Sequence, residues 1–294
     1  MSYQENSFFS NDSHNLALYL KDTAHRTRNV QLFIVSCIKK SIGSKYSWGN
    51  SISHAKMKHE YVLLPVTNMG KIDFDFMDSF VRELEEARVR ELSAYLTVSG
   101  LTDYELTAAE EDTLKRFSSI PWKTFNLKEL FGKATRGKRL KSSDRIPGHL
   151  IFVTAGEADE GISAYIGNPV KVFSKNTVTI DMFGSAKYRD YDYGADDHVA
   201  VVHTEKLPKH AALFVTSAIH KAAHTGKFSY ARNFYAKDAD ELNIRLPVQN
   251  DVPDFAFMDT FVRAVEKLVI KDVVLYADKK IAATKQIAGK GSCQ

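Results

Sequence analysis

Hydrophobic side chains recur with helical spacing in two long segments of this sequence, 74–96 and 254–286. In each segment the apolar positions stay close to a 3.6-residue period and charged residues fill the opposite positions, which predicts two amphipathic helices. Helices of about 21 and 30 residues within these segments have lengths of roughly 31 and 45 Å at about 1.5 Å per residue. Two apolar faces of this length favour packing against each other, although each helix could also be an ordinary core helix. If the helices end two copies of a repeat related by a pseudo-two-fold axis, their packing is antiparallel. The expected seam contains Phe80, Leu84, Phe261 and Val265.

Between the two long helices the pattern changes to short runs of β-branched residues separated by glycines, which is typical of strands and turns. These runs lie at 151–154, 170–173, 177–181 and 199–203. Two shorter helices are also predicted, because Thr107 and Glu110 have the spacing of a capping box and the segment 210–223 is mostly apolar. The expected fold class is therefore α/β, or α+β, with irregular mixed β-structure and two long antiparallel spacer helices.

The chain repeats itself at an offset of 181–184 residues. The segment 33–40 recurs at 214–221, and the segment 76–82, FMDSFVR, recurs at 257–263 as FMDTFVR. The second copy is preceded by about 70 residues, 122–191, that have no counterpart before the first copy. The sequence therefore predicts a partial first copy and a complete second copy, each followed by a long helix.

Positive charge is concentrated in one part of the chain. The whole chain of 294 residues has 40 basic and 36 acidic residues, a formal net charge of +4. The segment 121–149 alone has eight basic and two acidic residues, a net charge of +6. A basic loop of this kind suits contact with DNA phosphates, whereas the alternative is an ordinary solvated surface loop. Its candidate DNA-binding residues are Lys133, Arg136, Lys138, Arg139, Lys141 and Arg145.

Further basic residues, some with tyrosines beside them, extend this candidate DNA surface. Basic side chains can contact phosphates, and neighbouring Tyr or Arg side chains can reach base edges. These further candidates are Lys187, Tyr188, Arg189, Lys221, Lys227, Tyr230 and Arg232, together with Lys40 and Lys45 of the first copy.

The sequence contains few candidates for catalytic residues. The sequence lacks the Gly-rich nucleotide motifs and the HExxH and GxSxG motifs. Asp196, Asp197 and His198 form one acidic cluster, which is better interpreted as a strand-capping turn than as a metal site, and His220 and His224 lack nearby acids. We therefore expect no catalytic residue, no metal site and no cofactor, although a chain with its own nuclease or methyltransferase activity is the alternative.

No apolar run reaches the roughly 18 residues that a membrane span needs, and the chain has only two cysteines, Cys37 and Cys293. We expect a cytoplasmic protein that has no membrane contact.

Several ordered motifs resemble those of a known family. The segment 122–131, WKTFNLKELF, looks like the opening motif of a target-recognition domain. The segments 152–155, 161–166 and 176–184 look like its internal strands. The segment 257–285 is similar to the helical spacer that follows such a domain. The chain thus resembles the specificity subunit of type I restriction-modification systems and, equally, the recognition subunit of the related two-subunit type II enzymes.

This resemblance implies a non-catalytic subunit that reads double-stranded DNA and positions methyltransferase subunits, and in some systems restriction subunits. S-adenosylmethionine, ATP and metal then belong to the partners. A half-subunit that binds the methyltransferase without reading DNA is the other alternative. The expected organisation is a partial recognition domain (1–70), a spacer helix (71–100), a linker helix (101–120), a complete recognition domain (121–250), and a second spacer helix with a tail (251–294). The apolar side chains of the partial first domain are expected to need cover from another polypeptide, either a second copy of this chain or a different one. The alternatives are cover by the other domain and a half-unit that folds compactly alone around Phe33, Ile38 and Val62.

Overall fold

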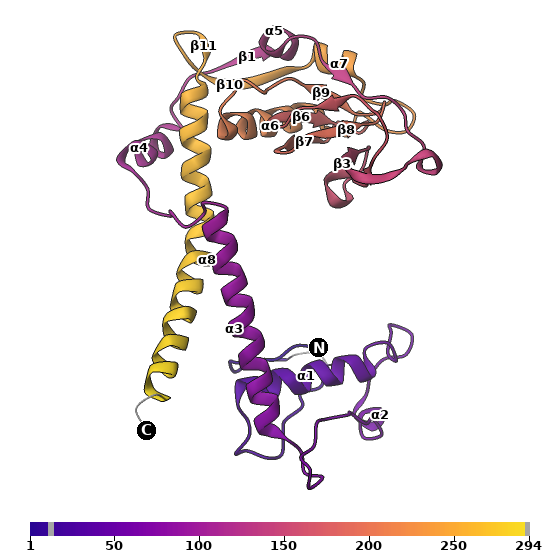
Figure 1. The fold of residues 1–294 in the computed structure, drawn as a ribbon, viewed down its shortest axis with the longest axis vertical. Coiled ribbons are helices and arrows are strands. Elements are labelled where there is room, and N and C mark those ends of the chain that lie inside the picture. The colour runs from indigo at the N-terminus through magenta and orange to yellow at the C-terminus, as the bar shows by residue number, and fades with distance from the viewer. Residues whose placement is uncertain (11–14, 292–294) are drawn as a thin grey trace. The chain divides into compact units, whose positions relative to one another are not determined.

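The computed structural model of the chain describes residues 1–10 and 15–291. It forms two compact units (Figure 1). Unit 1 comprises Met1–Thr102 together with Asp272–Gln294, and unit 2 comprises Asp103–Lys271.

Unit 1 is mostly helical. Its helices before residue 102 are α1 (Arg28–Ile42), α2 (His54–Met57) and α3 (Phe74–Val98). The side chains of Thr27 and Asp73 accept hydrogen bonds from free backbone N–H groups at the starts of α1 and α3, so a polar cap defines where each helix begins. Helix α1 packs against α3.

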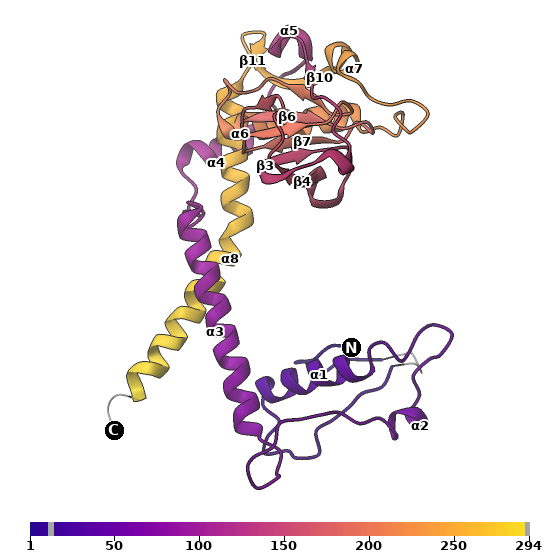
Figure 2. The same ribbon diagram turned by 45° about the vertical axis from the view of Figure 1, so that its right-hand side comes forward.

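The last helix, α8 (Phe255–Gly291), begins in unit 2 and ends in unit 1. Within unit 1 its C-terminal part lies beside α3 and runs in the opposite direction (Figures 1 and 2). Lys280 Nζ of α8 lies 3.8 Å from a carboxylate oxygen of Glu85 in α3. The two long antiparallel helices predicted from the 3.6-residue period are therefore confirmed. Among the described residues, no helix is long and apolar enough to cross a membrane.

The seam predicted for these helices is wrong. Phe80 packs against Phe33 of α1, with ring centroids 5.7 Å apart, and Phe261 stacks on Phe117 at 4.2 Å. Leu84 and Val265 are 46% and 37% exposed. Phe261 also meets Phe214 at 6.0 Å, as Phe80 meets Phe33. Phe80 and Phe261 thus each contact a phenylalanine of the 15-residue helix in their own copy of the repeat.

Unit 2 contains three small sheets. Their hydrogen-bonded orders are β1-β10-β11, β2-β9-β6-β7 and β4-β3-β8-β5. The strands are β1 (Trp122–Asn126), β2 (Thr135–Arg136), β3 (Pro147–Val153), β4 (Ile162–Ile166), β5 (Val172–Phe173), β6 (Thr177–Ile180), β7 (Ala186–Arg189), β8 (Tyr193–Ala195), β9 (Ala200–Val202), β10 (Asn243–Gln249) and β11 (Val252–Pro253). All pairings are antiparallel except that of β3 with β8. The mixed, irregular β-structure predicted from the sequence is confirmed.

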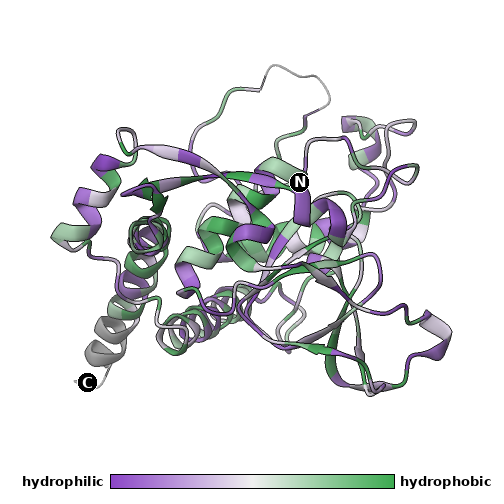
Figure 3. Ribbon diagram, turned by 90° about the horizontal axis from the view of Figure 1, so that it is seen from above, coloured by the Kyte–Doolittle hydropathy of each residue, from purple (hydrophilic) through white to green (hydrophobic). Residues whose placement is uncertain are grey.

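The helices of unit 2 cover these sheets. They are α4 (Ala108–Arg116), α5 (Leu127–Phe131), α6 (Lys209–Ala223), α7 (Ala236–Glu241) and the first part of α8. Figure 3 colours the residues of α6 mainly as hydrophobic, and Val215 and Ile219 of this helix are fully buried against β6, β7 and β10. Each such side chain contributes about 1.5–3 kcal/mol by its removal from water. The predicted capping box of Thr107 and Glu110 begins α4.

The internal repeat is present in the structure, element by element. Helices α1 and α6 each have 15 residues and begin 181 positions apart. The isolated bridge Ser47–Asn50 has its counterpart in Ser229–Arg232, and the bridge Val66–Ile72 corresponds to the pairing of β10 with β11. The two copies therefore share a helix, a tight hairpin turn and, before the long helix, an antiparallel pairing that in the first copy is a single bridge.

Candidate nucleic-acid interface

The segment 133–145, called the basic loop from here on, is anchored at its start by a strand. Arg136 lies in β2, where it pairs with Ala200 of β9, and the backbone N–H of Lys138 donates to the carbonyl oxygen of Ala195 at 3.1 Å. Gly137 between them lies directly against Ala195, so that a Cβ at this position would overlap the Ala195 carbonyl group. The loop backbone is therefore fixed to the sheet where its basic side chains begin.

Five basic side chains of the loop are exposed: Lys133, Arg136, Lys138, Arg139 and Lys141. Within residues 1–10 and 15–291, none of the five forms an ion pair with an acidic group. Their charges are thus not neutralised inside the molecule and remain available to an anionic partner. The structure brings these predicted site residues together on one short segment.

Arg145 differs from the other basic residues of the loop. Its side chain is half-buried, donates to the Leu140 carbonyl oxygen at 3.4 Å and lies over the Phe152 ring at 5.2 Å. Asn168 closes the same end of the loop, because its side chain accepts from the N–H of Ile146 and donates to the carbonyl oxygen of Asp144. Arg145 therefore shapes the loop, and its contacts leave it less available to DNA.

A methyl group at residue 137 tests whether this anchoring matters. In Gly137→Ala, the new Cβ forces the loop away from Ala195, and we expect DNA affinity to fall about tenfold because Arg136 and Lys138 flank the displaced residue. Titration of a fluorescent DNA duplex measures the change. Ser143→Ala, an exposed change in the same loop, is the matched control and should bind normally. Equal affinity of the Gly137→Ala variant and the unchanged chain would contradict the anchoring role.

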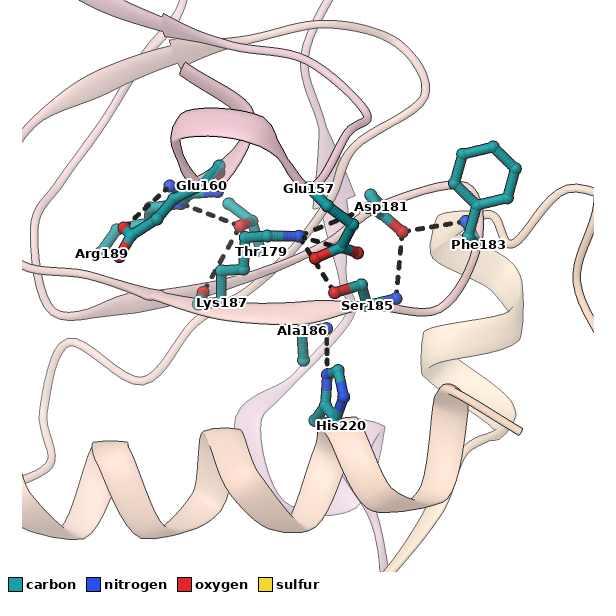
Figure 4. A network of polar contacts seen from close by, with 10 residues as sticks. All are labelled: Glu157, Glu160, Thr179, Asp181, Phe183, Ser185, Ala186, Lys187, Arg189 and His220. Carbon is teal, nitrogen blue, oxygen red and sulfur yellow. Dashed lines mark hydrogen bonds and ion pairs between the residues drawn. The ribbon is translucent and has the colours of Figure 1, made fainter. Parts of the chain in front are cut away.

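Two other predicted DNA-binding residues lie inside unit 2. Figure 4 shows the Arg189 side chain, 1% exposed, directed into a polar network. Its guanidinium donates to Thr179 Oγ1 at 2.9 Å, to the Tyr191 hydroxyl at 2.8 Å and to the carbonyl oxygen of Glu160 at 2.8 Å. Since all these donors are used inside the protein, we leave Arg189 out of the proposed interface.

Lys187 belongs to the same network (Figure 4). Its Nζ lies 3.5 Å from Glu157 and 3.5 Å from Asp181, and it donates to Ser185 Oγ at 3.0 Å. A hydrogen bond from Ser185 and the charge of Lys187 hold the pKa of Glu157 below its usual value. This lysine is therefore also left out of the proposed interface.

Tyr188, between these two residues, is partly buried and donates to Asn176 Oδ1 at 2.9 Å. Burial raises the pKa of its hydroxyl. Its hydroxyl is therefore already engaged within the domain.

The hairpin turns of the two copies carry strongly exposed aromatic residues near basic groups. Tyr230 is 85% exposed, and its ring edge meets Phe183 at 5.2 Å. In the same turn, Arg232 is exposed and lies over the ring of Phe228 at 5.4 Å. Lys227, two residues before the turn, is exposed as well. Three predicted site residues thus lie on one loop of unit 2.

The first copy presents the corresponding turn with Trp48, which is fully exposed. The sequence search missed this residue, although the offset of the repeat places it at the position of Tyr230. Lys45 beside it forms a 2.6 Å ion pair with Glu60 and is therefore less available. Lys40 and Lys221 are exposed near the C-terminal ends of α1 and α6.

The cluster Asp196, Asp197 and His198 occupies the turn between β8 and β9. Its three ligand atoms lie within 4.8 Å of one another. However, Asp196 Oδ1 accepts from the N–H of Asp197 at 2.9 Å, and Asp197 Oδ1 lies 3.0 Å from His198 Nδ1. Burial raises the pKa of Asp196. These contacts stabilise a tight turn between the two strands.

A sequence profile of the type I restriction modification DNA specificity domain matches residues 119–276, more than half of the chain. The chain belongs to this family. The matched part of this specificity subunit contains the basic loop, the hairpin turn of Tyr230 and residues 255–276 of α8. The resemblance predicted from the ordered motifs is therefore confirmed.

Two relatives show that the similarity extends over most of the specificity subunit. The type II restriction enzyme specificity subunit S.BcgI of Heyndrickxia coagulans is 24% identical over 273 residues, which are 91% of this chain and 74% of the relative. The crystal structure of a type I restriction-modification S subunit from M. genitalium superposes with a TM-score of 0.54 at 15% identity. The superposition covers 92% of this chain and 72% of the M. genitalium S subunit. The second relative supports the fold, including the part outside the matched profile.

Proposed function

We propose that this chain is a non-catalytic subunit that reads a specific sequence of double-stranded DNA. The observation that carries the proposal is the basic loop, where five exposed basic side chains without ion pairs in the described part of the chain extend from a segment fixed to a sheet. Phosphate contacts supply most of the sequence-independent affinity of such proteins and fix their register on the duplex. The basic loop thus positions the domain on the DNA backbone.

In this proposal, side chains on the hairpin turns contact the base edges and thereby recognise the sequence. Tyr230 and Arg232 in the second copy, and Trp48 in the first, extend into solvent near lysines. An arginine donates to guanine in the major groove, and exposed aromatic rings contact thymine methyl groups or neighbouring bases. Two copies of one turn allow the protein to read two separate groups of base pairs.

Catalysis belongs, in this proposal, to partner subunits that dock on the long helices. Helix α8 keeps a series of large apolar side chains partly exposed, which suits a protein partner. These residues are Leu268, Val269, Val273, Leu275 and Tyr276, with exposed fractions of 48%, 72%, 37%, 42% and 50%. The partners expected from the family are methyltransferase and restriction subunits.

Selection from a random duplex library tests the function. The full chain, alone and with a co-expressed modification subunit, should enrich one bipartite sequence. Enrichment of no sequence in either case, with the modification subunit still bound, would instead support a half-subunit that does not read DNA. Cleavage or methylation of DNA by the purified chain alone would support the enzymatic alternative.

Removal of the turn side chains should change sequence preference more than overall affinity. We expect Arg232→Ala to lose about tenfold in affinity for the selected sequence, or about 1.4 kcal/mol, and little for random DNA. Competition binding with selected and scrambled duplexes measures this. Lys237→Ala, which removes another exposed basic residue nearby, is the control. Equal losses on both duplexes would assign Arg232 to phosphate contact.

A further inference from the structure

Four aromatic side chains of unit 2 form a closed cycle of ring contacts. Phe117 stacks on Phe261 with ring centroids 4.2 Å apart, and Trp122 stacks on Phe214 at 6.1 Å. Phe117 also meets Trp122 edge-on at 5.7 Å, and Phe214 meets Phe261 edge-on at 6.0 Å. The four rings belong to the residue after α4, to β1, to α6 and to α8. They therefore join four elements around one apolar surface.

These rings line a groove of about 910 Å³. The rest of its wall is also mostly apolar and includes Leu213 of α6 and Val262 and Val265 of α8. A cavity of roughly 300–1,000 Å³ accommodates one small ligand, and an apolar lining with a few polar groups is typical of such sites. A protein partner, in contrast, usually covers about 800 Å² of surface. The size of the groove therefore favours a small molecule as its occupant.

Two basic side chains line the same groove, Lys221 of α6 and Arg245 of β10. Both are exposed, and within residues 1–10 and 15–291 neither forms an ion pair or donates a side-chain hydrogen bond. The alternation of β10 explains the position of the arginine. Ile244 and Leu246 are 1% and 0% exposed in the core, so Arg245 lies on the opposite face of the strand. Two unpaired cations beside an apolar surface favour a ligand with an anionic group and disfavour a cationic one.

The first copy of the repeat has only part of this arrangement. At offsets of 181 and 182 it has Phe33, Phe80 and Lys40, but Leu63 stands where the second copy has Arg245. The packing that the two copies share is thus formed without this arginine. Its charge is available to a ligand, and unit 2 has the more complete site.

We propose that the groove binds an apolar carboxylate, a small molecule with an aliphatic or aromatic body and one terminal carboxylate. The body covers the aromatic rings, and the carboxylate accepts hydrogen bonds from the Arg245 guanidinium and the Lys221 ammonium group. Hydrogen bonds between ionised groups are among the strongest in proteins, and arginine can hold a carboxylate through two parallel bonds. Lys221, which the sequence assigns to DNA, then has a different partner. The site does not require that unit 2 reads DNA.

Isothermal titration of the full chain with decanoate, in the absence of DNA, tests the site. We expect one decanoate bound per chain with a Kd of about 10–100 µM. Arg245→Ala and Lys221→Ala should each weaken binding about tenfold, because each removes a charged donor. Lys206→Ala and Lys237→Ala, which remove exposed lysines outside the groove, are the matched controls and should bind as the unchanged chain does.

Two further measurements separate the apolar contacts from the charge. Ser217→Trp fills the groove from an exposed position of α6 and should abolish decanoate binding, while circular dichroism shows an unchanged fold. Decan-1-ol, which has the same aliphatic body without the charge, should bind about tenfold more weakly than decanoate.

Four outcomes would overturn the proposal. They are the absence of binding at about 1 mM decanoate, equal binding of decanoate and decan-1-ol, and unchanged binding by the Arg245→Ala and Ser217→Trp variants. The fourth is displacement of bound decanoate by a short random DNA duplex, which would assign Lys221 and Arg245 to the DNA interface.

Discussion

Reversal of charge at Arg136, Arg139 and Lys141 should reduce the affinity for any DNA duplex by about 100- to 1000-fold at moderate salt, or about 3–4 kcal/mol. All three side chains are exposed on the basic loop and have no ion pair in the described part of the chain. Each phosphate contact that is lost lowers the slope of log affinity against log salt by about 0.9, so the slope should become shallower by about 2.7. Fluorescence titrations at several salt concentrations measure both quantities.

A variant with the same total charge separates a local effect from a general one. Reversal of charge at Lys115, Lys271 and Lys279, which are exposed on α4 and α8, changes the net charge equally but away from the basic loop. This control should lose only the small part of affinity that comes from long-range attraction. If both variants bind DNA equally well, the basic loop is an ordinary solvated segment, and the proposed interface is wrong.

The elements that the sequence predicted well are those with a strong local pattern. The period of apolar residues in α3 and α8 and the Thr107 cap of α4 are visible in one stretch of chain, and the structure has all three helices. The internal repeat predicted, in addition, that the elements of the first copy have counterparts in the second. The helical period identifies the apolar face of a helix, but it does not show which other element packs against that face. The period alone therefore predicts a seam between Phe261 and Phe80, whereas Phe261 stacks on Phe117, which lies far away in the sequence.

The candidate DNA interface likewise contains residues that a local pattern reveals and residues whose contacts it does not reveal. Lys138 and Arg139 were recognised because charge clusters locally, and the structure exposes them. Arg189 appeared equivalent in the sequence, yet it lies in β7, where side chains alternate between the two faces of the strand. Its partner carbonyl, that of Glu160, is 29 residues away. A contact at that separation has no local signal, so a buried arginine and a DNA-binding arginine look alike in the sequence.

Replacement of Arg189 by methionine should therefore destabilise unit 2 rather than only weaken DNA binding. The change leaves Thr179 Oγ1, the Tyr191 hydroxyl and the Glu160 carbonyl oxygen without their donor. A buried polar group without a partner costs about 1–3 kcal/mol. Removal of a buried charge offsets part of this cost. We expect a net loss of about 3 kcal/mol, and a decrease in the Tm of unit 2 of about 6–12 °C for a domain of this size.

Thermal unfolding followed by circular dichroism measures this loss, and Tyr188→Phe on the same strand is the matched control. That change removes one hydrogen bond, from the hydroxyl to Asn176 Oδ1, and should cost about 1 kcal/mol. The two variants together distinguish a structural arginine from a base-reading one. A structural Arg189 predicts a large decrease in Tm for Arg189→Met and, below that Tm, an unchanged order of preference among DNA sequences. An unchanged Tm with an altered preference would place Arg189 at the DNA and would require the network around Glu160 to open when DNA binds.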